Sequence, residues 1–186
     1  MQKATFASFQ QKPVKGICFI QRTLGTIKTM DWTLLKENIY YRDGSLRDIL
    51  IHDTTKEDWR KWVDFVNGHY KLEWYNGLQD QTFNHIDFDV VLEYFKDYPD
   101  FSIMASISLD KLKVHTYFFT QEEIENDIAP KEFTSLEDHN RLMDYLVSIS
   151  RLLNKKVILT PENTPEISLI EVTNNEITYP GLDGVA

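Results

Sequence analysis

Carboxylates are the residues of this 186-residue chain whose type and spacing most readily suggest chemistry. Seven of them fall between residues 120 and 139, and two at a suitable separation could act as the acid pair of a glycosidase. A catalytic carboxyl needs burial or a specific neighbour that shifts its pKa, and most neighbours along this segment are also acidic. We therefore favour a solvated acidic surface. The seven residues are Glu122, Glu123, Glu125, Asp127, Glu132, Glu137 and Asp138.

Histidines beside acids are the second chemical feature, in His52-Asp53 and Asp138-His139. Adjacent residues point apart on a strand or a helix, so neither pair forms a chelate alone. Convergence of His52, His115 and His139 with nearby acids would give a small enzyme or ligand-binding domain, which is our alternative hypothesis. The sequence contains no HExxH, CxxC, GxSxG or glycine-rich phosphate loop, so we predict no catalytic residue, no metal and no cofactor.

Charge is distributed unevenly along the chain. Residues 1–29 contain five basic residues and no acid, whereas residues 30–186 contain the other 15 basic and all 29 acidic residues, a formal net charge of −14. An acidic field of this kind repels nucleic acid and anionic membranes and attracts basic partners. No run of residues approaches the ~20 apolar positions that cross a bilayer. We therefore expect a cytoplasmic protein that binds neither nucleic acid nor membrane.

The same division of charge predicts the organisation of the chain. We expect a basic leader at residues 1–29, either poorly ordered or lying upstream of a native start at Met30, because organised sequence begins directly after it. A single α+β domain is then expected at residues 30–179, followed by a tail at 180–186. A chain of this size can bury a hydrophobic core without disulfides, and its single cysteine cannot form an internal one.

Aromatic residues between the acids suggest a docking surface. Carboxylates bind a basic partner and accelerate association, while tyrosine and tryptophan anchors supply binding energy. Trp59 and Trp62 share a helical stripe and are expected in the core, whereas Trp74, Tyr75 and Tyr98 lie at turns, which favours exposure. The predicted partner-binding residues are Tyr94, Asp97, Tyr98, Asp100, Glu122, Glu123, Glu125 and Asp127.

Two segments carry a resemblance to a known class of protein. One runs from Phe118 to Glu125 (FFTQEEIE) before a long helix, and the other from Val157 to Asn163 (VILTPEN) after it. Together with the acid excess, they resemble small, acidic bacterial immunity proteins, which neutralise toxins. The resemblance implies a non-enzymatic intracellular binding protein that occludes a basic partner, such as a toxin domain. A third hypothesis, separate from this resemblance, is a homodimeric structural module that uses the exposed face of residues 101–119, so we predict a monomer or a homodimer.

Most of the predicted strands form hairpins. Asp-Gly and Asn-Gly turns at residues 43–44 and 76–77 each separate two apolar runs, which is typical of a hairpin. Strict alternation at residues 101–109 and 112–118 predicts the clearest pair of strands. The remaining strands are expected at 157–160, 167–172 and 177–179.

Capping residues place the helices. Thr55 to Asp58 begins a helix that Gly68 is expected to end in a left-handed conformation. A second helix follows Asp87, and Thr120 with Glu123 suggests a short acidic helix before Pro130. The longest helix is expected from Ser135 to Asn154. The sequence therefore predicts an α+β fold: a mainly antiparallel sheet built from hairpins, with three main helices packed on one face.

Overall fold

The computed structural model describes residues 31–97, 100–180 and 182. The predicted leader, the predicted start at Met30, Tyr98 and most of the predicted tail lie outside the described residues. The helices are α1 (Trp32–Asn38), α2 (Lys56–His69), α3 (Phe88–Asp97) and α4 (Leu136–Leu153), with a 3-10 turn at Pro130–Glu132. The strands are β1 (Arg47–Ile51), β2 (Lys71–Asn76), β3 (Gln81–Phe83), β4 (Ile103–Leu109), β5 (Leu112–Tyr117), β6 (Ile124–Ile128), β7 (Lys156–Pro161), β8 (Ile170–Thr173) and β9 (Glu176–Thr178).

Within the described residues, nine strands form one antiparallel sheet in the order β3-β2-β4-β5-β6-β1-β7-β8-β9. The α+β class and the mainly antiparallel sheet are thus confirmed. The hairpins β2–β3, β4–β5 and β8–β9 form at the predicted turns. Gly77 is required in the first of them because a Cβ there would lie 2.4 Å from the backbone oxygen of Ser102.

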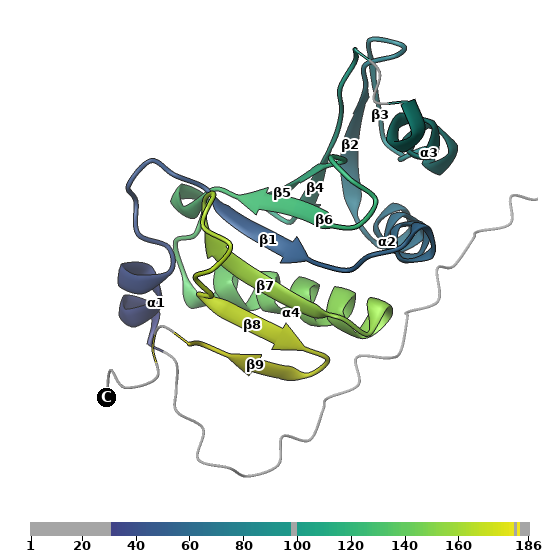
Figure 1. The fold of residues 1–186 in the computed structure, drawn as a ribbon. Helices are drawn as coiled ribbons and strands as arrows, with labels where there is room; N and C mark the ends of the chain where they lie inside the picture. The colour runs from purple at the N-terminus through teal and green to yellow at the C-terminus, as the bar shows by residue number, and fades with distance from the viewer. Residues whose placement is uncertain (1–30, 98–99, 181, 183–186) are drawn as a thin grey trace, which may run out of the picture.

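The two faces of the central sheet differ in character. Residues Ile49, Ile107, Val114 and Leu159 share one face and are buried, and α4 contacts β4, β7 and β8. In Figure 1, α4 passes behind β7 and β8, while the front of β5, β6, β1 and β7 carries no helix among the described residues. We call this front side the open face.

An aromatic cluster fills the core under α2. The rings of Trp59 and Trp62 meet edge to face at 5.6 Å, and Trp59 stacks at 5.3 Å on Phe118, which directly follows β5. The predicted burial of both tryptophans is confirmed. The predicted exposure of Trp74 is wrong, because alternation along β2 turns this residue inward with Leu72.

Helix termini follow the capping chemistry of the sequence. Thr55 and Asp58 form a capping box at the start of α2, and Ser135 caps α4. Asn154 ends α4 with φ of 52°, the left-handed conformation that asparagine tolerates. The predicted left-handed ending at Gly68 is wrong: α2 continues through His69 and ends at Tyr70 in an extended conformation.

The predicted hairpin around Asp43-Gly44 is also wrong. Asp31 accepts a hydrogen bond from the Thr33 amide at 3.0 Å and caps a helix, α1, in place of the first strand. Leu35 and Ile39 are four residues apart and are both buried, which is helical spacing. The second strand, β1, pairs instead with β6 and β7 from much later in the chain.

The predicted acidic helix after Thr120 is a strand, β6. Ile124, Asn126 and Ile128 alternate inward, while Glu125 and Asp127 alternate outward, so the period is two rather than 3.6. The Thr120 hydroxyl bonds to Glu122 instead of capping a helix. Pairing with β1 on one side and β5 on the other satisfies the backbone of this segment.

Candidate functional site

The strand register aligns a row of polar residues across the open face. Each strand alternates, so the residue that lies between two core positions points to the open side. His115 pairs with Asp127, Asp127 pairs with Asp48, and Asp48 pairs with Thr160. The whole row, from β2 to β7, consists of Glu73, Ser106, His115, Asp127, Asp48 and Thr160.

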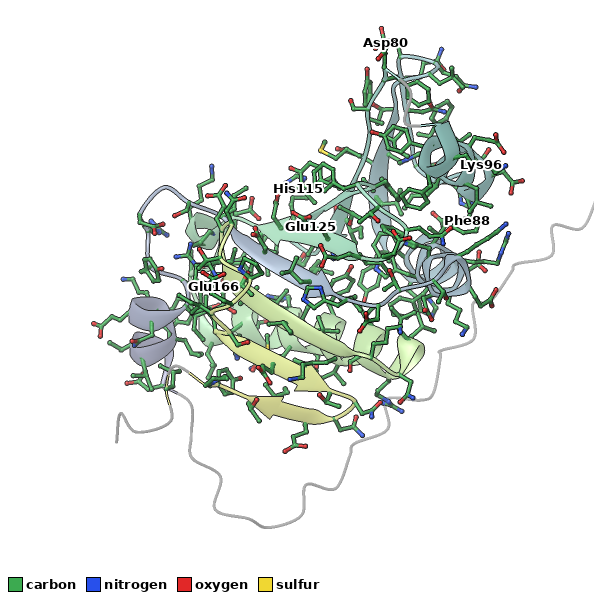
Figure 2. The ribbon with its side chains drawn as sticks, in the orientation of Figure 1. Asp80, Phe88, Lys96, His115, Glu125 and Glu166 are labelled. Atoms are coloured by element: carbon green, nitrogen blue, oxygen red, sulfur yellow. The ribbon has the colours of Figure 1, made fainter. Side chains whose placement is uncertain are left out.

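Four carboxylates gather around the middle of this row. Asp48, Glu125, Asp127 and Glu162 form what we call the acidic cluster. Directly opposed residues of antiparallel strands have Cβ atoms about 4.5–5.5 Å apart, which sets the separation of Asp48 from Asp127. Figure 2 labels Glu125 of this cluster, together with His115, over β5 and β6 in the middle of the sheet.

The loop after β7 forms one side of the cluster. The Asn163 amide donates to Asp48 Oδ2 at 2.8 Å, and Glu162 Oε2 accepts a hydrogen bond from the Leu46 amide at 3.0 Å. These two bonds hold the loop against β1, on the side where Asp48 lies. The loop therefore brings the Glu162 carboxylate close enough to interact with Asp48 and Asp127.

Burial and the neighbouring acids raise the pKa of three members of the cluster, Asp48, Glu125 and Asp127. Burial raises the pKa of Asp48, and Glu162 raises it further. Burial likewise raises the pKa of Glu125 and of Asp127, with Asp48 adding to both, although Tyr117 and His115 oppose part of the rise at Asp127. At neutral pH the cluster therefore concentrates like charges in a partly desolvated place, which destabilises the fold and favours a positively charged ligand.

Two buried polar atoms beside Asp48 have unused hydrogen-bonding capacity. Asp127 is 6% exposed and Thr160 is 0% exposed. Asp127 Oδ1 and Thr160 Oγ1 have no hydrogen-bond partner among the residues that the structure describes. Buried polar atoms are nearly always paired in native proteins, so an unpaired one marks a place where water or a ligand group binds. Both atoms flank the same carboxylate, Asp48.

An aromatic pair borders the cluster on the β5 side. The rings of Tyr117 and Phe119 are stacked at 5.3 Å with planes 9° apart, and Phe119 is 55% exposed. Burial and the neighbouring charges of Asp127 and Glu125 raise the pKa of Tyr117 to about 12, so its phenol stays neutral. The open face thus offers a flat aromatic surface directly beside carboxylates.

The four predicted partner-binding residues on or just before β6 lie in two places. Glu125 and Asp127 belong to the acidic cluster. The Glu123 carboxylate instead contacts the His52 ring at the far end of β1, and Glu122 is exposed in the preceding turn. His52 also lines a hollow of about 280 Å³ with Asp53, Lys155, Lys156 and Ile158, where two lysines offset the acids.

The other predicted partner-binding residues lie on or just after α3. Tyr94 packs against Phe101 at 5.6 Å, and Asp100 is exposed in the bend that follows. Phe95 of the same helix contacts Trp59 in the core, so α3 sits with α2 rather than on the open face. Figure 2 labels α3 residues Phe88 and Lys96 well to one side of His115 and Glu125. Tyr98 and the side chain of Asp97 lie outside the described residues.

The three histidines of the alternative hypothesis do not converge. His115 lies on the open face, and His52 lies at the end of β1. His139 is buried on α4, where its two ring nitrogens contact the hydroxyls of Tyr40 at 2.9 Å and Tyr179 at 3.0 Å. Burial lowers the pKa of His139 to about 4, as expected for a neutral core histidine.

Sequence reasoning missed Asp48, Thr160 and Glu162. The only local signal for Asp48 is its position between two residues whose side chains are fully buried in the structure, the apolar Ile49 and the basic Arg47. An acid at an outward position of a strand is ordinary, and only the pairing of β1 with both β6 and β7 brings it to the other acids. The site is therefore a product of long-range register.

Comparisons with known proteins give no assignment. No protein family, curated protein or solved structure matches this chain. In the described part of the chain, no helix is long and apolar enough to cross a membrane. Nor do any three His, Cys, Asp or Glu side chains there group as the ligands of a metal ion would. The geometry of the open face therefore carries the functional argument.

Proposed function

We propose that this chain is a non-enzymatic binding protein that docks a basic protein partner on its open face, around the acidic cluster. The observation that carries the proposal is the convergence of four carboxylates, from β1, β6 and the loop after β7, beside the stacked rings of half-buried Tyr117 and exposed Phe119. In this view the open face, which no helix among the described residues covers, is left to the partner. An intracellular immunity protein that occludes a basic toxin domain is the form that we favour.

Electrostatics support this choice of partner. The chain has a formal net charge of −9, and the acidic cluster adds a local concentration of negative charge. Complementary charge steers a basic partner to the face and rejects acidic ones. Raised carboxyl pKa values mean that the free protein is destabilised by its own acids, and a bound cation would relieve that repulsion.

A second candidate, a small enzyme, is favoured by one observation. His115 lies opposite Asp127 on adjacent strands, with the Tyr117 hydroxyl interacting with the same carboxylate. A carboxylate flanked by a histidine and a phenol could transfer protons. The histidine lies on an open sheet face rather than in a deep pocket, so we rank docking above catalysis.

Capture from a lysate of the encoding organism, with matched variants, tests the proposal. The open-face variant carries Asp48→Asn, Glu125→Gln and Asp127→Asn, and the control variant carries Glu37→Gln, Asp64→Asn and Asp144→Asn at exposed helix positions. Both remove three negative charges. We expect the wild type and the control to retain one basic protein in stoichiometric amount at low salt, and the open-face variant to lose it.

The dependence of capture on salt and the net charge of the captured protein decide between the hypotheses. Electrostatic docking of a basic partner should weaken as ionic strength rises, because salt screens the attraction between the two charged surfaces. Capture that is equal for the wild type and the open-face variant, or an acidic captured protein, would overturn the proposal. A product formed from a small molecule, and lost with His115→Ala, would favour the enzyme.

A further inference from the structure

The acidic cluster and the aromatic pair beside it have the features of a subsite for one particular side chain. We propose that the open face binds a single arginine of the partner, with its guanidinium between the Asp127 and Asp48 carboxylates and its flat side against Tyr117. This inference rests on the proposed docking of a basic partner and specifies the group that is recognised.

The first argument is the unused hydrogen-bonding capacity of the buried acid. Asp127 is 6% exposed, yet its Oδ1 has no partner among the described residues. An ionised carboxylate accepts hydrogen bonds only, so the missing group is a donor. Thr160 Oγ1, equally unpartnered in the described chain, is buried on the other side of Asp48. These two atoms point to a ligand independently of the number of acids nearby.

The second argument distinguishes arginine from lysine. Asp48 and Asp127 are paired across adjacent strands, and Glu125 lies opposite Leu50 on the same face, so acceptors are spread over several ångströms. A guanidinium has five donors in a planar fork, which can serve two carboxylates at once. An ammonium is a compact, strongly hydrated charge with three donors, and it would leave some of these oxygens unpaired.

The third argument is the aromatic surface. Tyr117 is half-buried and stacked on the exposed Phe119, so its ring is fixed in place before a partner arrives. Guanidinium groups stack on tyrosine faces, which adds attraction that depends on planarity as well as charge. An arginine that stacks on an aromatic ring can bond to carboxylates at the edge of its guanidinium.

A titration with two small probes of equal charge tests the inference. N-acetyl-arginine methylamide and N-acetyl-lysine methylamide each carry one positive charge, and binding to the full chain is followed by two-dimensional amide NMR at low salt. We expect the arginine probe to shift the amide signals of residues 48, 117, 127 and 160. The lysine probe should bind severalfold more weakly, because it lacks the planar fork.

Variants separate the contributions. Asp127→Asn should weaken arginine binding roughly tenfold, because a charge-assisted bond to the free oxygen is lost. Tyr117→Leu should reduce the preference for arginine over lysine, whereas Tyr117→Phe keeps the ring and should keep the preference. The Glu37, Asp64 and Asp144 triple variant should bind as the wild type does.

Three results would overturn the inference. The first is equal binding of the two probes, which would mean a diffuse negative field without a subsite. The second is the absence of any shift at the open face. The third is displacement of the arginine probe by an equimolar amount of calcium or magnesium, which would assign the oxygens to a divalent cation. If the probes fail while partner capture still depends on the open face, the subsite is wrong and the docking proposal stands.

Discussion

Replacing Asp127 with asparagine should stabilise the fold at neutral pH, because it removes a buried negative charge that lies beside other acids. The Cβ atoms of Asp127 and Asp48 lie about 5 Å apart as opposed strand residues. Two carboxylates at that separation would repel each other by about 3 kcal/mol with an effective dielectric constant near 20, and solvent at Asp48 screens part of this repulsion. A buried oxygen without a partner costs roughly 1–3 kcal/mol more. Asparagine keeps the shape, and its amide can donate to Asp48. We expect a gain of about 1–3 kcal/mol in the free energy of unfolding at pH 7.

The sign of the pH dependence follows from the raised pKa. Burial and neighbouring acids raise the folded-state pKa of Asp127 above its unfolded value of about 3.9. The folded state therefore holds the proton more tightly, and stability falls as pH rises from the unfolded pKa through the folded pKa. The destabilisation is complete above that window and absent below it. The advantage of Asp127→Asn should accordingly be full at pH 7 and shrink towards zero near pH 3.

Urea unfolding followed by tryptophan fluorescence measures this effect, because Trp59 and Trp62 are fully buried. The gain corresponds to a rise in Tm of roughly 2–4 °C per kcal/mol for a domain of this size. Glu37→Gln, at an exposed position, should change stability by less than about 0.5 kcal/mol. A variant less stable than the wild type at pH 7, or a gain that is equal at pH 3 and pH 7, would refute the reasoning.

Two further predictions concern positions away from the open face. The folded-state pKa of His139, lowered to about 4 by burial, should make the wild type lose roughly 3 kcal/mol as pH falls from 6.5 to 4. His139→Gln should lack this slope in urea unfolding, and an unchanged slope would contradict the assignment. Gly77→Ala should lower stability by about 1–3 kcal/mol, because its Cβ would lie 2.4 Å from the Ser102 oxygen. Gly68→Ala, in an open helical position, should be neutral or stabilising in the same thermal melt, and a similar loss in both would contradict the steric argument.

The fold class could be predicted because its signals are local. Alternation along β4, the capping box at Thr55 and the cap at Ser135 all act within a few residues and appear in the structure as predicted. The two elements whose type was predicted wrongly, α1 and β6, occur where the local signals were ambiguous. The segment that forms β6 has a plausible cap at Thr120, and only its inclusion between β1 and β5 makes the strand more stable.

The site was predictable only in part. Glu125, Asp127 and His115 were identified by residue type, because acids and histidines have side chains that can bind charged groups or transfer protons. Their assembly with Asp48 depends on a strand order that brings residues about 80 apart into direct register. No local pattern encodes that pairing, because each strand satisfies its own alternation whichever neighbour it has.

Asp138 provides a comparison for Asp127, because it is a buried carboxylate that caps a helix and has hydrogen-bond partners. Asp138 is fully buried, and burial alone would raise its pKa, yet hydrogen bonds from Thr134, Lys111 and Ser135 lower it to about 2. Asp127 is almost as buried but has an unpaired oxygen and acids as neighbours. Local conflicts of this kind are expected where function, rather than stability, determines the residue. A cation supplied by a partner would give Asp127 the surroundings that Lys111 and Thr134 already give Asp138.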